Sequence, residues 1–454
     1  MRIVIVGNGK VGITLTARLI NEGHEVTIID EDPNVLKFIT EQYDVLAING
    51  NGASMQVLRE AKAGSAELLI AVTASDEINI LSCMTARVLG CKHTIARVRN
   101  TEYTEQLNVL KDTLGLSMVI NPEMSVSREI FNTIQLPSFI SRETFLHGRV
   151  ELVSLILRGN NALIGKKLSQ IPHDKKFQVI ICAVERGSDL FIPTGDFLLA
   201  EGDRIHVTAE AKSLASFVKY MGIQASRVRD VVLIGGSKIA VHLGTQLANS
   251  GVNVTVVEID PVRCDELAQL LPHANIINAD ISTAGVMEEE IIGQHDAAVF
   301  LLGIDEANII LSLHATRLGV KKVISKVDRV DYQSIVDIIK DETIISPRLH
   351  SCNAIIRYVR AMSNARSMDY IRAVYRLVND RAEAIELSVP FDAPHLDDTL
   401  AELPLRRNVI IATIQRGSRV FFPTGSDSIN AGDTIIVFTT SQNKISSFSD
   451  LLDI

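Results

Sequence analysis

The feature that most constrains this chain is an internal repeat that spans almost its whole length. The segment at 3–12, with the sequence IVIVGNGKVG, returns at 231–240 as VVLIGGSKIA. Shorter motifs recur downstream in the same order: Asp30 and Glu258, Asp76-Glu77 and Asp305-Glu306, Asn121-Pro122 and Ser346-Pro347, Pro193-Thr194-Gly195 and Pro423-Thr424-Gly425. The chain is therefore predicted to be a duplicated two-part unit, in which each copy opens with a nucleotide-binding pattern.

The length of the chain and the repeat together predict its domains. A chain of 454 residues favours three or four domains of roughly 100–200 residues each. The repeat favours four, in the order large, small, large, small. We expect a first Rossmann domain at 1–122, a connecting helix at 123–143, a small lobe at 144–226, a second Rossmann domain at 227–347, a second connecting helix at 348–371 and a second small lobe at 372–454.

Composition and charge exclude several classes of protein. A hydrophobic fraction of 46% is ample for packed cores, and the net charge of −9 argues against a nonspecific nucleic-acid or anionic-membrane surface. No apolar run approaches the roughly 20 residues that span a bilayer, and Met1-Arg2 leads directly into a strand, so no signal peptide is expected. The five cysteines show no CxxC spacing, which indicates a reducing cytoplasm and no structural zinc.

Alternating strands and helices predict the architecture of each large domain. Apolar runs at 2–6, 26–29, 45–48, 68–72 and 93–98 are typical of buried parallel strands. The segments between them have helical patterns, and this alternation predicts a doubly wound α/β sheet. Each sheet is followed by a further predicted helix, roughly 123–134 in the first copy and 348–363 in the second. The segments 145–222 and 383–454 contain short strands and glycine turns, which favours small α+β lobes.

The first glycine motif carries the clearest chemistry. Gly7-x-Gly9-x-x-Gly12 follows a strand and opens a helix, so a pyrophosphate would face the helix N-terminus. Asp30 ends the next strand, where a carboxylate hydrogen-bonds ribose hydroxyls and repels a 2′-phosphate. This favours NAD(H) or an adenosine nucleotide over NADP(H). The predicted site consists of Gly7, Asn8, Gly9, Lys10, Val11, Gly12 and Asp30.

The second glycine motif departs from the pattern. Ser237 replaces its middle glycine and Ala240 its last glycine, while Glu258 keeps the acid at the end of the next strand. A serine side chain stands where a pyrophosphate would pass, whereas alanine is tolerated at the last position. The second site can bind weakly, bind another nucleotide or stay empty. Its predicted residues are Gly235, Gly236, Ser237, Lys238, Ile239 and Glu258.

Further candidates follow the fourth and fifth strands, because ligands of open α/β sheets bind at the carboxyl edge. They are Thr73, Ala74, Asp76 and Glu77 in the first copy, and Leu302, Gly303 and Asp305 in the second. Arg97 and Lys326 end the fifth strands and suit a phosphate. Alternatively, Asp76 caps a helix, and Arg97 forms a salt bridge with a nearby acid such as Asp76. Asn51 and Asp280 are candidates for adenine or ribose contacts, or for helix caps.

No catalytic constellation is recognisable in the sequence. His147, His173 and His206 do not recur in the second copy, and neither metal-ligand spacing nor a GxSxG or HExxH motif occurs. A dehydrogenase needs a substrate domain that supplies a proton donor or acceptor near the nicotinamide. The small lobes offer no such group, so a non-enzymatic sensor is favoured over an NAD-dependent oxidoreductase.

Taken together, these motifs resemble the TrkA family, the regulatory subunits of Trk-type potassium uptake systems of bacteria and archaea. The resemblance covers nearly the whole chain, as two RCK units. It rests on the residues Gly7–Gly12, Asp30, Asp76-Glu77 with Asn79, Arg97, Pro193-Thr194-Gly195 and Gly202-Asp203. It implies an α/β fold of tandem Rossmann-like N-lobes, each followed by a small α+β C-terminal lobe. The departures at Ser237 and Ala240 put the second nucleotide site in question.

The resemblance also implies a function and its partners. Members of the family bind NAD(H), or ATP and ADP, and assemble into a ring beneath a membrane-embedded potassium-translocating subunit of the TrkH or TrkG type. We therefore expect a cytoplasmic homo-oligomer, a tetramer, peripherally associated with the membrane and without a nucleic-acid partner. The alternatives are a regulator of another cation transporter with its ligand in the small lobes, and an NAD-dependent oxidoreductase.

Overall fold

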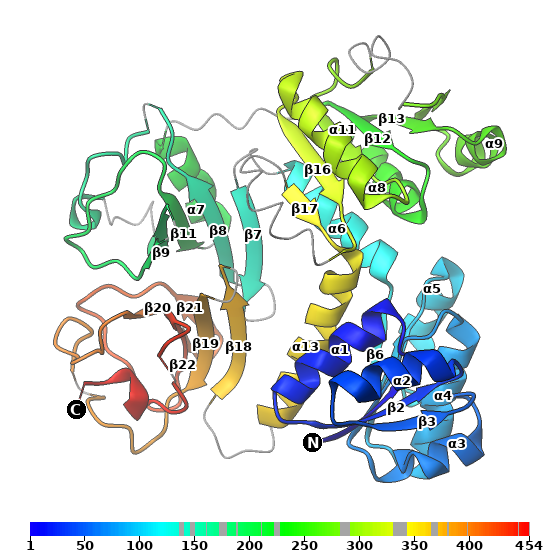
Figure 1. Ribbon diagram of the computed structural model, residues 1–454. Helices are drawn as coiled ribbons and strands as arrows, with labels where there is room; N and C mark the ends of the chain where they lie inside the picture. Colours follow the sequence, from blue (N-terminus) through cyan, green and yellow to red (C-terminus); the bar gives the residue numbers. More distant parts are fainter. Residues whose placement is uncertain are drawn as a thin grey trace. The chain divides into compact units, whose positions relative to one another are not determined.

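The computed structural model groups the chain into two compact units. Unit 1 comprises Met1–Gln135 and Val228–Ile356, and unit 2 comprises Leu136–Arg227 and Arg357–Ile454 (Figure 1). The residues that the structure describes are 1–135, 140–145, 150–159, 161–171, 179–187, 189–209, 211–221, 228–281, 291–329, 343–364, 371–378, 381–396, 398–443 and 445–453. Within them, no helix combines the length and the apolar composition that crossing a bilayer requires.

The first half of unit 1, called lobe 1 here, is a six-stranded parallel sheet between helices. Its elements are β1 (Arg2–Val6), α1 (Lys10–Asn21), β2 (Glu25–Asp30), α2 (Pro33–Gln42), β3 (Leu46–Asn49), α3 (Met55–Glu60), β4 (Leu68–Ala71), α4 (Asp76–Leu89), β5 (His93–Arg97), α5 (Thr101–Leu110) and β6 (Met118–Ile120). The strand order β3-β2-β1-β4-β5-β6 is that of a doubly wound Rossmann fold. It brings the ends of β1, β2, β4 and β5 to one edge.

The second half, lobe 2, repeats this sheet. Its elements are β12 (Asp230–Ile234), α8 (Lys238–Asn249), β13 (Asn253–Glu258), α9 (Pro261–Leu270), β14 (Asn275–Asn278), β15 (Ala297–Phe300), α11 (Asp305–Arg317), β16 (Lys322–Lys326) and β17 (Thr343–Ile345). The strand order β14-β13-β12-β15-β16-β17 matches that of lobe 1 position by position. The predicted α/β fold class is therefore confirmed.

The helix that follows each sheet packs on the opposite lobe. α6 (Pro122–Gln135) follows lobe 1, but Val126, Ile130 and Ile134 are buried in the core of lobe 2. Their spacing of four residues places them on one helical face. α13 (Pro347–Asn364) follows lobe 2, and the Cys352 thiol lies 3.7 Å from the carbonyl oxygen of Val11 at the start of α1. The two halves of unit 1 thus exchange helices.

A buried lysine holds the C-terminal end of α6. Lys322 is 6% exposed, and its Nζ donates to the carbonyl oxygens of Thr133 at 2.9 Å and Ile134 at 2.5 Å. These carbonyls belong to the last turn of α6, which has no further intrahelical donors. Burial lowers the pKa of Lys322 to about 8.

The buried Lys322 predicts a measurable pH dependence of stability. An unfolded lysine has a pKa of about 10.4, so between pH 8 and 10 the unfolded chain binds more protons than the folded one, and stability rises with pH. Relative to Lys322→Met, the free energy of unfolding of the wild type should rise by roughly 1–2 kcal/mol between pH 7.5 and 9.5, measured by urea denaturation. Lys321→Met, at an exposed neighbouring residue, is the control. Identical pH profiles for wild type and Lys322→Met would refute this prediction.

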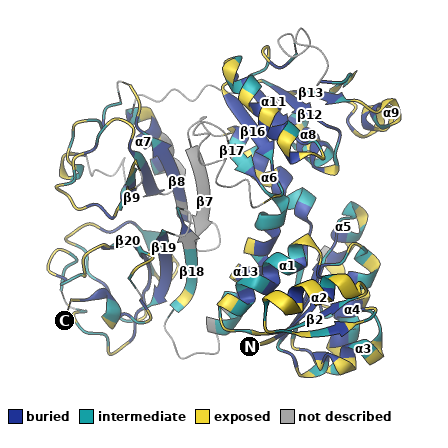
Figure 2. Cartoon of the chain, viewed as in Figure 1, coloured by how far each residue is buried: buried dark blue, intermediate teal, exposed yellow. Residues whose placement is uncertain are grey.

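Unit 2 contains two antiparallel sheets. The first consists of β7 (Ile140–Phe145), β8 (Val150–Ile156), β9 (Val179–Arg186), β10 (Asp189–Phe191) and β11 (Arg204–Ala209), with α7 (Ala211–Tyr220) after it. The second consists of β18 (Ile371–Leu377), β19 (Ala382–Ser388), β20 (Val409–Arg416), β21 (Arg419–Phe421) and β22 (Thr434–Thr440). Buried residues of both sheets, among them Leu152, Cys182, Ala384 and Phe438, form one shared core, and the strands around it are mostly buried (Figure 2).

The recurring Gly-Asp turns of the small lobes have a structural role. Asp203 and Asp433 are almost fully buried. Each accepts a side-chain hydrogen bond from an arginine, Arg186 at 2.7 Å and Arg416 at 2.8 Å, and a backbone one at the adjoining loop. Since a buried carboxylate requires such partners, the turns recur because they close the sheets.

Candidate nucleotide-binding site

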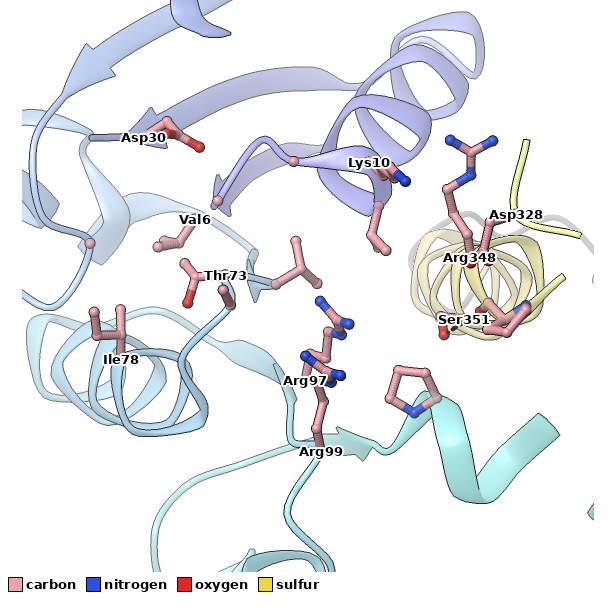
Figure 3. Close-up of a pocket in the computed structure, with 18 of the residues that line it drawn as sticks. Val6, Lys10, Asp30, Thr73, Ile78, Arg97, Arg99, Asp328, Arg348 and Ser351 are labelled. Carbon is pink, nitrogen blue, oxygen red and sulfur yellow. Dashed lines mark hydrogen bonds between the residues drawn. The ribbon is translucent and has the colours of Figure 1, made fainter. Parts of the chain in front are cut away.

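A cavity of about 780 Å³ opens at the carboxyl edge of the lobe 1 sheet. One side is formed by the glycine turn after β1 and by the ends of β2, β4 and β5. The other side is formed by residues of lobe 2 and by the start of α13, including Asp328, Arg348 and Ser351 (Figure 3). The cavity therefore belongs to both halves of unit 1, because the exchanged helix α13 closes it.

The three glycines of the first motif have three different environments. Gly7 has a φ of +90°, and a side chain there would meet the backbone of Thr73 at 2.8 Å. A side chain at Gly12 would lie 2.2 Å from the carbonyl oxygen of Gly7, so helix and strand approach closely only with glycine. At Gly9 no atom lies within 4 Å of such a side chain. The first turn of α1 also has no side-chain cap, which leaves space and backbone amides for an anion.

Asp30 fixes the glycine turn and also lines the cavity. Its carboxylate accepts from the amide of Asn8 at 2.6 Å and from the amide of Asp32 at 2.9 Å. The side chain of Asn8 is fully buried and is not part of the cavity lining. Asp30 lies where the sequence places it, and its contact with a ribose stays a prediction.

The repeated Asp-Glu and Asn residues form the scaffold of the cavity edge. Asp76 accepts from the amides of Arg99 at 2.9 Å and Asn100 at 2.7 Å. Asn79 accepts from the Thr73 amide and donates to the Arg97 carbonyl, both at 2.8 Å. Side-chain contacts to the backbone thereby hold the loops after β4 and β5 against each other.

Lobe 2 repeats this arrangement. Asp305 accepts from the amides of Asp328 and Arg329, and Asn308 links Leu302 to Lys326. Asp76 is not the helix cap that we considered from the sequence. The cap of α4 is Ser75, whose hydroxyl accepts from the amide of Ile78, while Glu77 accepts from the Ser75 hydroxyl.

Arg97 extends from the end of β5 into the cavity, as Figure 3 shows. Within the described residues its buried Nε atom has no hydrogen-bond partner. The alternative of a salt bridge to Asp76 is wrong, since the Asp76 carboxylate accepts from backbone amides instead. Burial, together with the nearby charge of Arg99, lowers the pKa of Arg97 although Glu123 acts in the opposite direction. This side chain is therefore a candidate phosphate ligand.

Several predicted residues lie outside the cavity lining. Asn51 accepts from the Ala53 amide at 2.8 Å in the turn before α3, whose cap is Ser54. Gly12, Asp76, Glu77, Leu302, Gly303 and Asp305, together with Asp280, Gly235, Gly236 and Glu258, are also absent from the lining. Sequence reasoning missed Val35, Arg99, Glu123, Asp328, Arg348 and Ser351, which line the cavity. Arg99 could have been predicted from its place directly after the fifth strand. Arg348 and Ser351 could not, because they line the cavity only through the exchange of α13.

The glycine turn of lobe 2 is filled by its own side chains. Arg263 Nε donates to the carbonyl of Gly236 at 2.8 Å, and a methyl group of Leu267 lies 2.4 Å from where a Gly236 side chain would begin. Arg263 occupies the position that Val35, a cavity-lining residue, holds in lobe 1. Ser237 caps α8 through Ala240, and Glu258 binds the Gly236 amide at 2.6 Å. Ser237, Lys238 and Ile239 instead line the lobe 1 cavity.

Comparison with known proteins matches both parts of each repeat. The TrkA-N domain matches residues 3–122 and 231–347, and the TrkA-C domain matches residues 152–222 and 384–453. The chain belongs to the TrkA family. It is thus a member of a family of regulatory subunits, and the expectation that it is not an enzyme is confirmed.

TrkA relatives match along nearly the whole chain. A Trk system potassium uptake protein TrkA homolog of Archaeoglobus fulgidus is 30% identical over 438 residues, which cover 96% of this chain and 97% of the relative. The Trk system potassium uptake protein TrkA of Haemophilus influenzae is 29% identical over 452 residues, covering 98% and 97%. The TrkA assignment therefore includes both Rossmann lobes and both small lobes.

Solved structures show the same fold. The GsuK channel bound to NAD has a TM-score of 0.63 and 17% identity, and the match covers 97% of this chain and 77% of that chain. The GsuK RCK domain also has a TM-score of 0.63, at 18% identity, with 97% and 92% covered. At this identity the likeness shows the fold alone, which consists of Rossmann-like and small lobes in tandem.

Proposed function

We propose that this TrkA-family chain is a cytoplasmic nucleotide-sensing subunit, at the inner face of the membrane, that gates a potassium-translocating membrane subunit of the TrkH or TrkG type. One observation carries the proposal: the lobe 1 cavity, which both halves of unit 1 enclose, combines an open glycine turn, Asp30 and two arginines whose buried Nε atoms have no partner among the described residues. A ligand in this cavity contacts residues of both lobes. It can therefore favour one arrangement of the lobes over another.

The chemistry of the cavity supports NAD(H), or ATP and ADP, as ligands. The anion would lie at Gly9 and the start of α1, and the ribose at Asp30. A carboxylate at this position disfavours the 2′-phosphate of NADP(H). The fold neighbour GsuK has been solved as a channel bound to NAD, which is consistent with a dinucleotide in this fold.

Gating requires that the nucleotide bind one arrangement of lobes 1 and 2 more tightly than the other. Coupling of this kind typically amounts to about 1–3 kcal/mol. Lys238 and Lys326 from lobe 2 line the same cavity as Gly9 and Asp30 from lobe 1. A change in the separation of the lobes would therefore change the ligand contacts, and by reciprocity the ligand biases that separation.

A direct experiment tests this function. The membrane partner is reconstituted in proteoliposomes with the intact chain, and potassium flux is measured while NADH, NAD, ATP or ADP is added. Nucleotide-dependent flux, together with binding of one nucleotide per chain by calorimetry, is expected, because Arg263 and Leu267 fill the lobe 2 turn. Flux that is indifferent to every nucleotide would contradict the proposal, and two equivalent sites per chain would contradict the assignment to lobe 1.

The assembly expected of this subunit is a homo-oligomeric ring, a tetramer, and exposed apolar side chains support it. On α4, Leu81 is 51% and Val88 79% exposed, two turns apart on one face. On α11, the matching helix of lobe 2, Ile310 is 66% and Leu313 44% exposed. Leu81 and Ile310 hold matching positions in the two copies, and apolar side chains exposed in this way favour a contact surface on these helices.

Charges on the α4 stripe should therefore disrupt assembly. For Leu81→Asp/Val88→Asp we expect a shift toward smaller species in light scattering after size-exclusion chromatography, because each carboxylate would have to be desolvated at the contact. Lys37→Asp, at an exposed position of α2, should leave the mass unchanged. A wild-type chain that is monomeric at micromolar concentration would exclude the ring.

A further inference from the structure

The lobe 1 cavity has two chemically different ends. At the end of β2 lie the acidic residues Asp30, Glu31 and Asp32. The basic residues Lys10, Arg97, Arg99, Lys238, Lys326 and Arg348 line the remainder, and among the described lining residues the acids there are Glu123 and Asp328. Glu123 is already paired with Arg99, whose Nε lies 2.7 Å from its carboxylate. The acidic end suits ribose hydroxyls, and the basic end suits an anion.

Two arginines at the basic end carry the argument. The Nε atoms of Arg97 and Arg348 are both buried, and within the part of the chain that the structure describes neither has a hydrogen-bond partner. Arg97 comes from β5 of lobe 1, whereas Arg348 comes from the first turn of α13 on the other side of the cavity (Figure 3). A buried N–H group such as these requires an acceptor. A phosphate group provides two in the geometry of the guanidinium fork.

The position of Arg348 adds to this preference. It is the second residue of an 18-residue helix, and a helix N-terminus attracts negative charge. The equivalent place in the first copy, after Pro122, is occupied by Glu123. The two halves therefore supply opposite charges at this matching helix position, and here only the second half supplies a cation, Arg348.

The chemistry at the basic end separates the candidate ligands. A nucleoside triphosphate carries its anionic terminal phosphates away from the ribose, toward this end. A dinucleotide instead places a second ribose and a nicotinamide there, and the nicotinamide of NAD is itself cationic. We propose that the basic end of the cavity binds the terminal phosphates of an adenosine triphosphate or diphosphate, and that Arg348 of α13 is the residue that distinguishes these ligands from NAD(H).

This inference rests on the proposed nucleotide function and assigns a physical route to it. Arg348 moves with α13, which packs on α1 through Cys352 and Asn353. A terminal phosphate shared by Arg97 and Arg348 would tie α13 to the edge of the lobe 1 sheet. A ligand without that phosphate would not connect Arg97 with Arg348.

The test is calorimetric titration of the full chain with ATP, ADP, AMP and NADH. For Arg348→Met we expect the Kd for ATP to rise by about 10- to 100-fold, the range of a lost charge-assisted hydrogen bond, with less than a threefold change for AMP and NADH. Arg357→Met, an exposed site on the same helix, is the matched control and should bind all four ligands as the wild type does.

Three results would overturn the inference. An unchanged Kd for ATP in Arg348→Met would remove Arg348 from the site. An equal loss for AMP would show that Arg348 does not act on the terminal phosphates. If the variant does not fold, the Kd values of the wild type for AMP and ATP still test the inference. Equal values would exclude a terminal-phosphate site. Failure of the proposed function appears differently, as a wild type that binds no nucleotide.

Discussion

Replacing Asp30 by alanine is expected to weaken NADH binding by about 100-fold or more. The carboxylate of Asp30 accepts from the amides of Asn8 and Asp32 and lines the cavity. Its removal therefore takes away the proposed ribose contact and loosens the glycine turn. Two charge-assisted hydrogen bonds of roughly 1.5–3 kcal/mol each more than account for this loss, which calorimetry of the intact chain would measure.

The matched control is the corresponding acid of lobe 2. Glu258 also binds the glycine turn, through the Gly236 amide, but it does not line the cavity. Glu258→Ala should therefore leave the NADH affinity within about threefold of the wild type while lowering thermal stability. If Glu258→Ala removed binding and Asp30→Ala did not, the ligand would lie in lobe 2.

Replacing Gly12 by alanine is expected to weaken both nucleotide binding and the fold. The added carbon would lie 2.2 Å from the backbone oxygen of Gly7, and no side-chain rotation relieves a clash with backbone. Overpacking of this kind costs roughly 1–3 kcal/mol. Because α1 must move away from β1, nucleotide affinity should fall together with the free energy of unfolding, both measurable on one preparation.

The repeat provides the reciprocal control for this substitution. Ala240 holds the matching position in lobe 2 and is fully buried in α8. Ala240→Gly should cost about 1 kcal/mol through helix propensity and leave nucleotide affinity unchanged. A Gly12→Ala chain with wild-type stability and affinity would show that the close approach of α1 to β1 is not required.

The sequence predicted the sheets well, because their signals are local. Buried apolar strands, the glycine turn and an acid at the end of β2 lie within about 30 residues of one another, and their order alone specifies a doubly wound fold. Repetition strengthened each assignment. The small lobes were predicted only as segments with short strands and glycine turns, and the strands β7, β18 and β19 were not predicted individually.

The side chains that complete the cavity were harder to predict. Asp76 and Asn79 were recognised as repeated. Their hydrogen bonds to the backbone near Arg97 and Arg99 depend on the distance between the loops after β4 and β5, which the sequence does not reveal. Arg348 and Ser351 come from a helix more than 200 residues away. No local pattern shows that α13 crosses to the other lobe, since its apolar face would suit either one. Whether the site residues bind a nucleotide stays a prediction.

The exchange of α6 and α13 also affects how the chain is made. Val126, Ile130 and Ile134 leave the ribosome long before Val231, Leu243 and Leu267, the lobe 2 residues among which they are finally buried. During synthesis the apolar face of α6 therefore stays exposed until lobe 2 has been made. Long-range contacts of this kind slow folding and increase aggregation. A first copy made alone would keep this apolar face of α6 exposed unless another chain covered it. The duplication thus supplies, within one chain, the partner surface that each crossing helix needs.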